Sequence, residues 1–220
     1  MLNISSLKTF ALAGMIVLGF AAQTRTALAD DLETLTVAGG CFWCVEADFE
    51  RVEGVTGAVS GYTGGSVENP TYKQVTRGGT GHYEAVQITY DPSIVSRTTL
   101  LSLFFRSVDP TDAGGQFCDR GESYRTAVFA DTPQAQEDAA AAKAKAAKVL
   151  GQTIVTPILP AAPFYEAEDY HQDYYRSDDL VLTRFGPKRK SSAYKAYRDA
   201  CGRDQRVREL WGENAPFLPS

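Results

Sequence analysis

Strand-like and helix-like patterns of apolar residues alternate along the first two thirds of this 220-residue chain. Alternating apolar residues from Glu33 to Ala38 predict a strand, which a Gly-Gly turn separates from a helix starting at Cys41 and ending before Gly54. The elements expected after it are strands over 54–65, 81–92 and 123–131, with a helix over 96–108 before the last strand. The order β-α-β-β-α-β predicts an α+β fold, a two-layer α/β sandwich with a split, ferredoxin-like core.

The elements outside this core are an extra helix, a strand and a long C-terminal tail. An Ala-rich stretch with Glu and Lys predicts the helix from Pro133 to Leu150, and "TIVTPIL" predicts the strand over 153–159. The tail from Phe164 onward is rich in Tyr and in charged residues, and its pattern assigns no element. We expect the tail to be mobile from about residue 176.

The N-terminus has the pattern of a secretory signal peptide. Lys8 is followed by an apolar run from Phe10 to Ala22, and the small residues Ala27 and Ala29 flank Leu28. This run is short for a membrane span, so we expect cleavage after Ala29 and export, to the periplasm, rather than an uncleaved anchor. The mature chain, residues 30–220, is long enough for a single catalytic domain with a sizeable core.

Charge excludes some classes of partner. Cleavage removes two basic residues and no acidic ones, which leaves 20 basic and 27 acidic residues and a net charge of −7. Such a balance argues against nucleic acid and against an anionic membrane surface as the main partner. We therefore expect no binding to nucleic acid, and none to a membrane after the signal peptide is cleaved. Separately, we expect a monomer.

The four cysteines allow several readings. In an exported protein they suggest two structural disulfides, yet Cys41 and Cys44 are close together while Cys118 and Cys201 lie far away. A zinc site is disfavoured and no metal is expected, because neither histidine lies near another cysteine or histidine in the sequence. A redox pair, a structural bond and a catalytic thiol are still open for Cys41 and Cys44.

The position of Cys41 favours a reactive thiol. It lies where a strand ends, a glycine turn passes and a helix begins, so unpaired backbone N–H groups and the helix dipole would stabilise a thiolate and lower its pKa. Gly39 and Gly40 would leave room for a substrate to approach the backbone. Phe42 and Trp43, between the two cysteines, indicate a pocket for an apolar group, since sulfur and methyl groups pack well on aromatic rings.

Three other side chains are candidates for proton donors. Glu84 alternates with Val86 and Ile88 along one face of the predicted strand, and a carboxylate on an apolar face has a raised pKa and can act as an acid. Tyr124, at the start of a strand, and Tyr72, in "NPTYKQV", are phenols that can donate hydrogen bonds. A surface glutamate and two core tyrosines are the alternative interpretation.

The chain resembles the A-type peptide methionine sulfoxide reductases. The resemblance covers about residues 39–175 and is carried by these segments, in that family's order: "GGCFWCVE", "GVTGAVSGYTGG", "NPTYKQV", "GGTGHYEAVQITYDP", "DPTDAGGQFCDRGESYRTAVF" and "FYEAEDYHQDYY". It implies an enzyme that reduces the S epimer of methionine sulfoxide, free or in proteins, and so repairs proteins after oxidative stress. It also implies a two-layer α/β sandwich, in agreement with the element order above.

The resemblance also implies roles for individual residues. The nucleophile falls on Cys41, the clamp for the substrate methyl group on Phe42 and Trp43, and the acid on Glu84. Two helper hydroxyls and a further site aspartate are implied as well, at Tyr72, Tyr124 and Asp119. Attack by Cys41 on a sulfoxide whose oxygen is hydrogen-bonded releases methionine and leaves a sulfenic acid, which a second thiol converts to a disulfide.

The second thiol is the least determined part of the site. The family often uses a cysteine in its C-terminal tail, which favours Cys201 in "YKAYRDACGRD". Cys44 is nearer in sequence and leaves a direct Cys41–Cys44 bond open, while Cys118 is the third choice. No bound cofactor is expected, and the disulfide would be reopened by thiol exchange with a thioredoxin-like protein of the envelope.

Two other functions are compatible with parts of the sequence. A general periplasmic thiol-disulfide oxidoreductase would depend on the two adjacent cysteines alone and would be indifferent to Glu84→Gln. A secreted module without catalytic activity would hold all four cysteines in structural disulfides.

Overall fold

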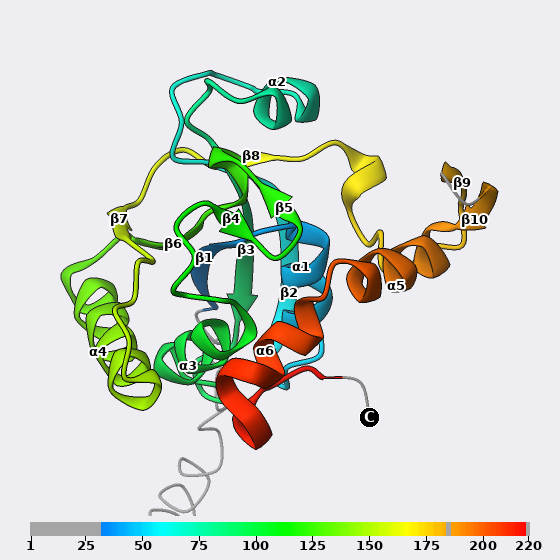
Figure 1. Ribbon diagram of the computed structural model, residues 1–220. Helices are drawn as coiled ribbons and strands as arrows, with labels where there is room; N and C mark the ends of the chain where they lie inside the picture. Colours follow the sequence, from blue (N-terminus) through cyan, green and yellow to red (C-terminus); the bar gives the residue numbers. More distant parts are fainter. Residues whose placement is uncertain (1–31, 184–185, 219–220) are drawn as a thin grey trace, which may run out of the picture. The chain divides into compact units, whose positions relative to one another are not determined.

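The centre of the fold is a six-stranded mixed sheet with the strand order β7-β6-β1-β3-β2-β8. The computed structural model describes residues 32–183 and 186–218, which fall in one compact unit, and the predicted signal peptide lies outside these ranges. Only β6 and β7 pair in parallel, and the other neighbouring strands pair antiparallel. The class is therefore mixed α/β, as Figure 1 shows.

The elements agree closely with the sequence patterns in the first two thirds of the chain. The strands of the sheet are β1 (Glu33–Gly39), β2 (Val55–Thr63), β3 (Tyr83–Tyr90), β6 (Thr126–Ala130), β7 (Ile158–Pro160) and β8 (Tyr165–Glu166). Helices α1 (Phe42–Phe49), α3 (Arg97–Ser107) and α4 (Pro133–Leu150) lie at the predicted places, and α4 matches its predicted bounds. The expected strand over 153–159 is shorter and begins later, as β7.

Several short elements connect these parts and were not expected. They are helix α2 (Tyr72–Arg77), the hairpin of β4 (Gly115–Gln116) and β5 (Asp119–Arg120), and the 3₁₀ turns η1 (Glu122–Tyr124) and η2 (Asp169–His171). Tyr72 is thus the first residue of a helix, and Tyr124 lies in η1, just before the strand that it was expected to begin. The capping box of Thr71 and Gln74 starts α2.

The unassigned tail folds into a hairpin and two helices. The hairpin joins β9 (Leu180–Thr183) to β10 (Gly186–Arg189), and α5 (Lys190–Ala200), α6 (Arg203–Trp211) and the turn η3 (Gly212–Asn214) follow. Of these, α6 lies close to α3 in Figure 1, and Val207 and Trp211 of α6 join the main core.

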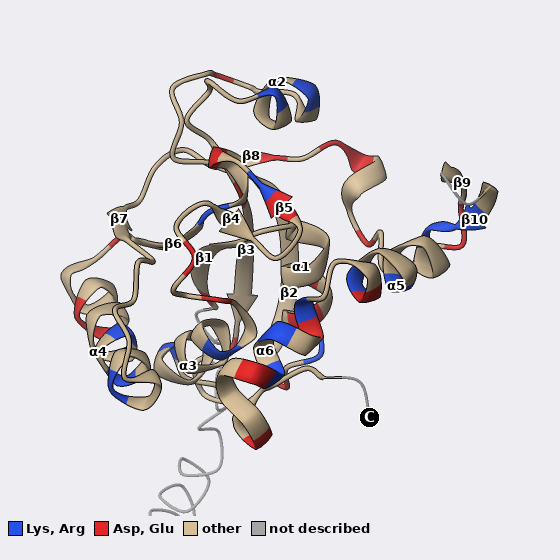
Figure 2. Ribbon diagram, in the orientation of Figure 1, with Lys and Arg blue, Asp and Glu red and all other residues tan. Residues whose placement is uncertain are grey.

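Most of the core lies between the sheet and the helices. Leu35 and Val37 of β1 belong to the main cluster, whereas the next residue, Ala38, faces a smaller cluster on the other side of the sheet. Helix α3 buries Leu100, Leu101, Phe104 and Phe105, as its spacing predicted. Charged residues occur mainly on helices and loops, and the central strands in Figure 2 are mostly uncharged. Within the described ranges, no helix is both long enough and apolar enough to span a bilayer.

Candidate active site

The site is built where β1 ends beside β3. The two strands pair antiparallel with Val37 opposite Val86, and two residues further the same register places Gly39 level with Glu84. Gly40 then turns the chain with φ of +81°, and Cys41 is the N-cap of α1. This turn brings the first N–H of α1, on Phe42, to within 3.1 Å of Glu84 Oε2.

Gly39 and Gly40 are required by the packing of neighbouring side chains and not by the approach of a substrate. A Cβ atom at Gly40 would lie 2.6 Å from Gln116 Cβ, and one at Gly39 would lie 2.9 Å from Val45 Cγ2. Contacts this short are not tolerated, and Gly40 also has a positive φ that favours glycine. The expectation that these glycines leave room for a substrate is therefore wrong, because Gln116 and Val45 already occupy the space.

Glu84 is a buried acid. Its side chain is 1% exposed, Oε2 accepts the Phe42 N–H, and Oε1 has no hydrogen-bond partner in the described part of the chain. Burial raises its pKa to about 8, and the neighbouring negative charge of Asp119 adds to the increase, against the hydrogen bond from Phe42. The carboxyl group is therefore mostly protonated at neutral pH and can donate a proton, as expected from the strand pattern.

Tyr72, Tyr124 and Asp119 surround this acid. Burial raises the pKa of both phenols, and the negative charge of Glu84 adds to the increase in each case, which places both hydroxyl groups near the carboxyl group. Burial also raises the pKa of Asp119, whose carboxylate accepts a hydrogen bond from the hydroxyl of Tyr197. The structure thus brings together all three residues that the sequence placed around Glu84.

An aromatic wall extends from the N-terminus of α1. Phe42 is fully buried, with its ring centroid 6.3 Å from Tyr72 and 5.1 Å from His171. Trp43 is partly exposed and stacks on Tyr174, at 3.8 Å between ring centroids and an interplanar angle of 11°. Phe42 therefore also serves as core packing, and Trp43 is the aromatic residue that is open to a ligand.

The pKa values of the two thiols at the start of α1 are shifted in opposite directions, which the sequence did not predict. Cys41 and Cys44 are both free, buried and in hydrogen-bond contact. The pKa of Cys41 is raised, first by this hydrogen bond and then by burial and by the negative charges of Cys44, Glu84 and Asp119. The pKa of Cys44 is lowered, chiefly by the same hydrogen bond. The expected low pKa at Cys41 is wrong, because the helix N-terminus does not outweigh burial and the neighbouring sulfur.

Cys41 is also less accessible than its place at a helix start suggested, with only 7% of its surface exposed. Tyr174 and Tyr194 pack with the two free cysteines in one cluster, and Tyr197 of α5 meets Trp43 edge-on at 6.4 Å between ring centroids. Helix α5 therefore covers the reactive thiol in this state. A cavity of about 420 Å³ lies beside it, with Trp43, Cys118 and Cys201 in its lining.

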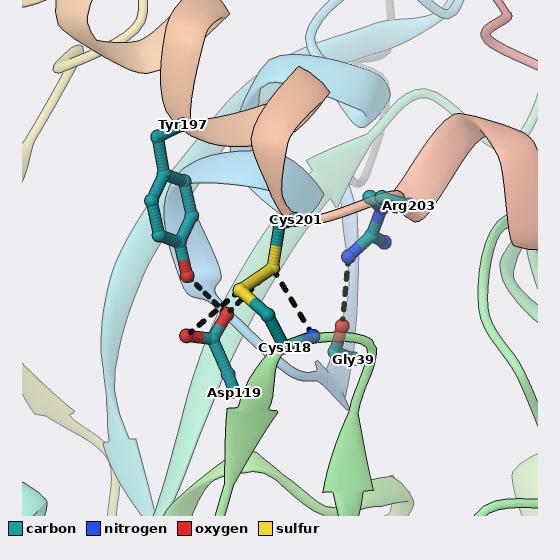
Figure 3. Close-up of a disulfide and its surroundings, with 6 residues drawn as sticks. All are labelled: Gly39, Cys118, Asp119, Tyr197, Cys201 and Arg203. Atoms are coloured by element: carbon teal, nitrogen blue, oxygen red, sulfur yellow. Dashed lines mark hydrogen bonds between the residues drawn. A yellow bond between two sulfur atoms is a disulfide. The ribbon is translucent and has the colours of Figure 1, made fainter.

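Cys118 and Cys201 form a disulfide that joins the β4–β5 hairpin to the end of α5. Figure 3 shows this bond beside Asp119, whose Oδ2 lies 3.9 Å from the Cys201 sulfur. The bond places Cys201 near the site, as the sequence proposed. It also pairs Cys201 with Cys118, whereas Cys44 is the free thiol in contact with Cys41.

Some residues of the site were missed in the sequence. Tyr194, Tyr197 and Arg198 recur at spacings of three and four, which places them on one face of α5, and this face leads to Cys201, the one member that the sequence analysis had named. This periodicity could have identified the helix and its inward face, but the face is polar. His171, which lies against Phe42 and Tyr72, has a pKa lowered to about 4 by burial and is therefore neutral at physiological pH.

Comparisons with known proteins give one consistent result. The family model for peptide methionine sulfoxide reductase matches residues 33–214. Peptide methionine sulfoxide reductase MsrA 2 of Caulobacter vibrioides is 49% identical over 201 residues, covering 91% of this chain and 95% of the relative. Peptide methionine sulfoxide reductase MsrA of Bacillus subtilis is 46% identical over 187 residues, covering 84% and 99%.

Solved structures agree with these relatives. Methionine sulfoxide reductase A of Corynebacterium diphtheriae is 33% identical, with a TM-score of 0.61 over 70% of this chain and 78% of that chain. Reduced Mxr1 from Saccharomyces cerevisiae is 32% identical, with a TM-score of 0.62 over 65% and 83%.

The site combines two free thiols, a wall of aromatic side chains and a carboxyl group that is protonated at neutral pH. These features define a thiol-dependent oxidoreductase. The chain belongs to the peptide methionine sulfoxide reductase family, which confirms the resemblance found in the sequence. It is an enzyme that reduces methionine sulfoxide.

Proposed function

We propose that Cys41 attacks the sulfur of the S epimer of methionine sulfoxide, free or in proteins, while Glu84 supplies the proton. The buried carboxyl group of Glu84 carries this proposal. Among the described residues, its Oε1 has no hydrogen-bond partner, and its raised pKa keeps it protonated when a substrate arrives. A sulfoxide sulfur becomes a good electrophile only when its oxygen is protonated or strongly hydrogen-bonded.

The first step transfers one oxygen atom. The sulfoxide oxygen takes its proton from Glu84, with hydrogen bonds from Tyr72 and Tyr124, and Asp119 contributes charge beside them. Trp43 and Phe42 hold the methyl group against their rings. The proton of Cys41 passes to Cys44, which accepts the hydrogen bond from Cys41. Methionine leaves, and Cys41 carries the oxygen as a sulfenic acid.

The second step is a condensation, and Cys44 is the first candidate for it. The sequence favoured Cys201, but Cys44 is the free thiol in contact with Cys41, while Cys201 is bonded to Cys118. Cys44 attacks the sulfenic sulfur, a Cys41–Cys44 disulfide forms, and the oxygen leaves as water. Cys201 becomes available for this step only after the Cys118–Cys201 bond has been reduced.

A protein dithiol then restores the two thiols by disulfide exchange. We infer a thioredoxin-like reductant, which leaves as its own disulfide, and no prosthetic group is needed for this cycle. Substrate and reductant both need access to Cys41, which is 7% exposed, so α5 has to move away from Trp43. The expected mobility of the tail from about residue 176 would allow this movement.

We also infer the cellular location and the detailed topology of the core, neither of which follows from membership of the family. The pattern of residues 1–29 supports export to the periplasm, with residues 30–220 as the single catalytic domain, acting as a monomer. The order β6-β1-β3-β2, with antiparallel pairing throughout, supports a ferredoxin-like split β-α-β-β-α-β core.

Single turnover of the reduced protein with the two purified sulfoxide epimers tests this function. We expect consumption of the S epimer alone, with the loss of two thiols per methionine formed and no turnover by Cys41→Ser. Equal use of both epimers, or thiol exchange that Glu84→Gln does not affect, would favour a general thiol-disulfide oxidoreductase.

A further inference from the structure

Two arginines of the C-terminal helices reach a buried carboxylate behind Cys44. Asp48 is completely buried and follows Cys44 by four residues, so the two side chains are neighbours on one face of α1. Arg198 of α5 donates from Nη1 to Asp48 Oδ1 at 2.8 Å, and Arg203 Nε, at the start of α6, lies 3.9 Å from Asp48 Oδ2. Arg198 is 8% exposed and Arg203 is 2% exposed.

The cluster has more buried positive charge than negative charge. Besides Asp48, Arg203 lies over the ring of Phe117, 4.9 Å from its centroid, and donates to the main-chain carbonyl groups of Gly39 and Ser107 at 3.1 and 3.0 Å. Arg198 also pairs with Asp204, whose side chain is 21% exposed and therefore partly screened by solvent. Two fully or nearly buried guanidinium groups thus share one fully buried carboxylate. A surplus of positive charge in a dry site stabilises a nearby anion.

The anion that this surplus can stabilise is the Cys44 sulfur. Cys44 packs against Tyr194, whose hydroxyl group accepts a hydrogen bond of 3.0 Å from Arg198. The positive charges of Arg203 and Arg198 lower the pKa of Cys44 after the larger effect of Cys41, and they oppose burial and Asp48. The titratable and charged groups that face Cys44 are Cys41 and Asp48 on α1, Glu84 on β3, Tyr194, Tyr197 and Arg198 on α5, and Arg203 on α6.

We propose that Arg198 and Arg203 are positioning residues that hold Cys44 as a thiolate, ready to attack the sulfenic acid on Cys41. The inference rests on the proposed role of Cys44 as the resolving thiol. In this step the Cys44–Cys41 S–S bond forms and the S–O bond of Cys41 breaks. Cys44 first loses the proton that it received from Cys41, which the two positive charges favour. The electron pair of its thiolate then forms the S–S bond, and the hydroxide that leaves Cys41 takes up this proton and departs as water.

The surface disulfide anchors both arginines. Cys201 lies between them in the sequence, and Gly202, with φ of +73°, turns the chain from α5 into α6. Figure 3 shows Cys201 bonded to Cys118 and Arg203 directed toward the Gly39 carbonyl oxygen. The disulfide therefore fixes the turn between α5 and α6, and this turn positions Arg198 and Arg203 near Cys44.

Titration of Cys44 in a Cys41→Ser background tests the proposal. With the Cys118–Cys201 disulfide intact, Cys44 is then the one free thiol, and its ultraviolet thiolate absorbance reports its midpoint pH. We expect Arg198→Gln to raise the midpoint by about 1 pH unit, as for loss of an opposite charge a few ångströms away. Arg198→Lys should keep it near the parent value, and Asp48→Asn should lower it, because the opposing negative charge is removed.

The opposite signs of these two shifts distinguish charge from packing. A purely structural role would move both midpoints in the same direction or in neither, and that result would overturn the proposal. Arg189→Gln, at an exposed arginine paired with Asp178, is the matched control and should leave the midpoint unchanged. If Arg198→Gln does not fold, as judged by circular dichroism, Asp48→Asn decides: an unchanged or raised midpoint contradicts the proposal. Failure of Cys44 to resolve Cys41 would instead appear in disulfide mapping, with the titration unaffected.

Discussion

At the residue scale, the proposed reaction depends on which groups hold two protons. Glu84 keeps one because its burial makes the ionised form costly, and the Cys41–Cys44 pair keeps the other between two sulfur atoms. Neither state follows from one residue alone. Glu84 is buried because α1 packs over β3, and Cys44 has a low pKa because Cys41 and two arginines face it.

The raised pKa of Glu84 sets the pH dependence. Below about pH 8 the carboxyl group is protonated and can donate, and above this pH its ionisation removes the donor. The single-turnover rate should therefore fall as the pH rises through about 8. Glu84→Gln should lose this alkaline decline and be slower by about a hundredfold or more, the usual contribution of a general acid. Rapid-quench measurement of methionine formed across this pH range checks both, and an unchanged rate in the variant would count against Glu84.

Substitution of Cys44 determines which cysteine is the resolving thiol. Cys44→Ser protein with Cys118 and Cys201 still bonded should complete one turnover but accumulate the sulfenic acid, because no second thiol is in contact with Cys41. A sulfenic-acid trapping reagent and peptide mass mapping would detect it. Fully reduced Cys44→Ser protein that forms a Cys41–Cys201 bond as fast as the parent closes its disulfide would show that Cys201 is the resolver.

At the element scale, α5 controls access to the thiol. Removal of the disulfide by a Cys118→Ser, Cys201→Ser double substitution should speed alkylation of Cys41 in the folded protein, because α5 is no longer tied to the β4–β5 hairpin. The same change should lower the free energy of unfolding by about 2–4 kcal/mol, a typical value for a disulfide. Peptide-resolved alkylation rates and urea unfolding measure these effects. Unchanged alkylation would mean that α5 covers Cys41 independently of the bond.

Helix α3 allows a simpler stability prediction. Leu100 is completely buried between the sheet and α4, so Leu100→Ala should destabilise the protein by about 2–5 kcal/mol through lost burial and the cavity left behind. Chemical denaturation measures the change, and Thr98→Ala, on the same helix but exposed, is a control expected to change stability much less.

The elements differ in how far the sequence predicts them. The apolar spacing of α3 and the composition of α4 gave their positions, since each buries a recognisable face or favours helix strongly. Helix α5 was missed because its inward face consists of Tyr194, Tyr197 and Arg198, which hydrophobic periodicity does not register. Cys41, Glu84 and Trp43 were recognisable from local context and family resemblance. The Cys118–Cys201 bond was not, because cysteine spacing does not determine connectivity.

At the scale of the whole molecule, the sheet brings distant segments to one place. Pairing of β1 with β3 sets the end of β1 beside Glu84, and the C-terminal helices return to close the site from the other side. We propose that residues 1–29 are a signal peptide that the catalytic domain does not need. A chain of residues 30–220 should therefore match the full chain in thermal unfolding midpoint and single-turnover rate. A lower midpoint would contradict the proposed domain boundary.

The most direct test of the account follows the oxygen atom itself. Cys44→Ser protein, with its Cys118–Cys201 disulfide intact, is allowed one turnover with the S epimer of methionine sulfoxide labelled with oxygen-18, and the thiols are then trapped and mapped by mass spectrometry. The account predicts one labelled oxygen on the sulfur of Cys41 for each methionine released. Methionine released with no label on Cys41, or with the label on another cysteine, would contradict it.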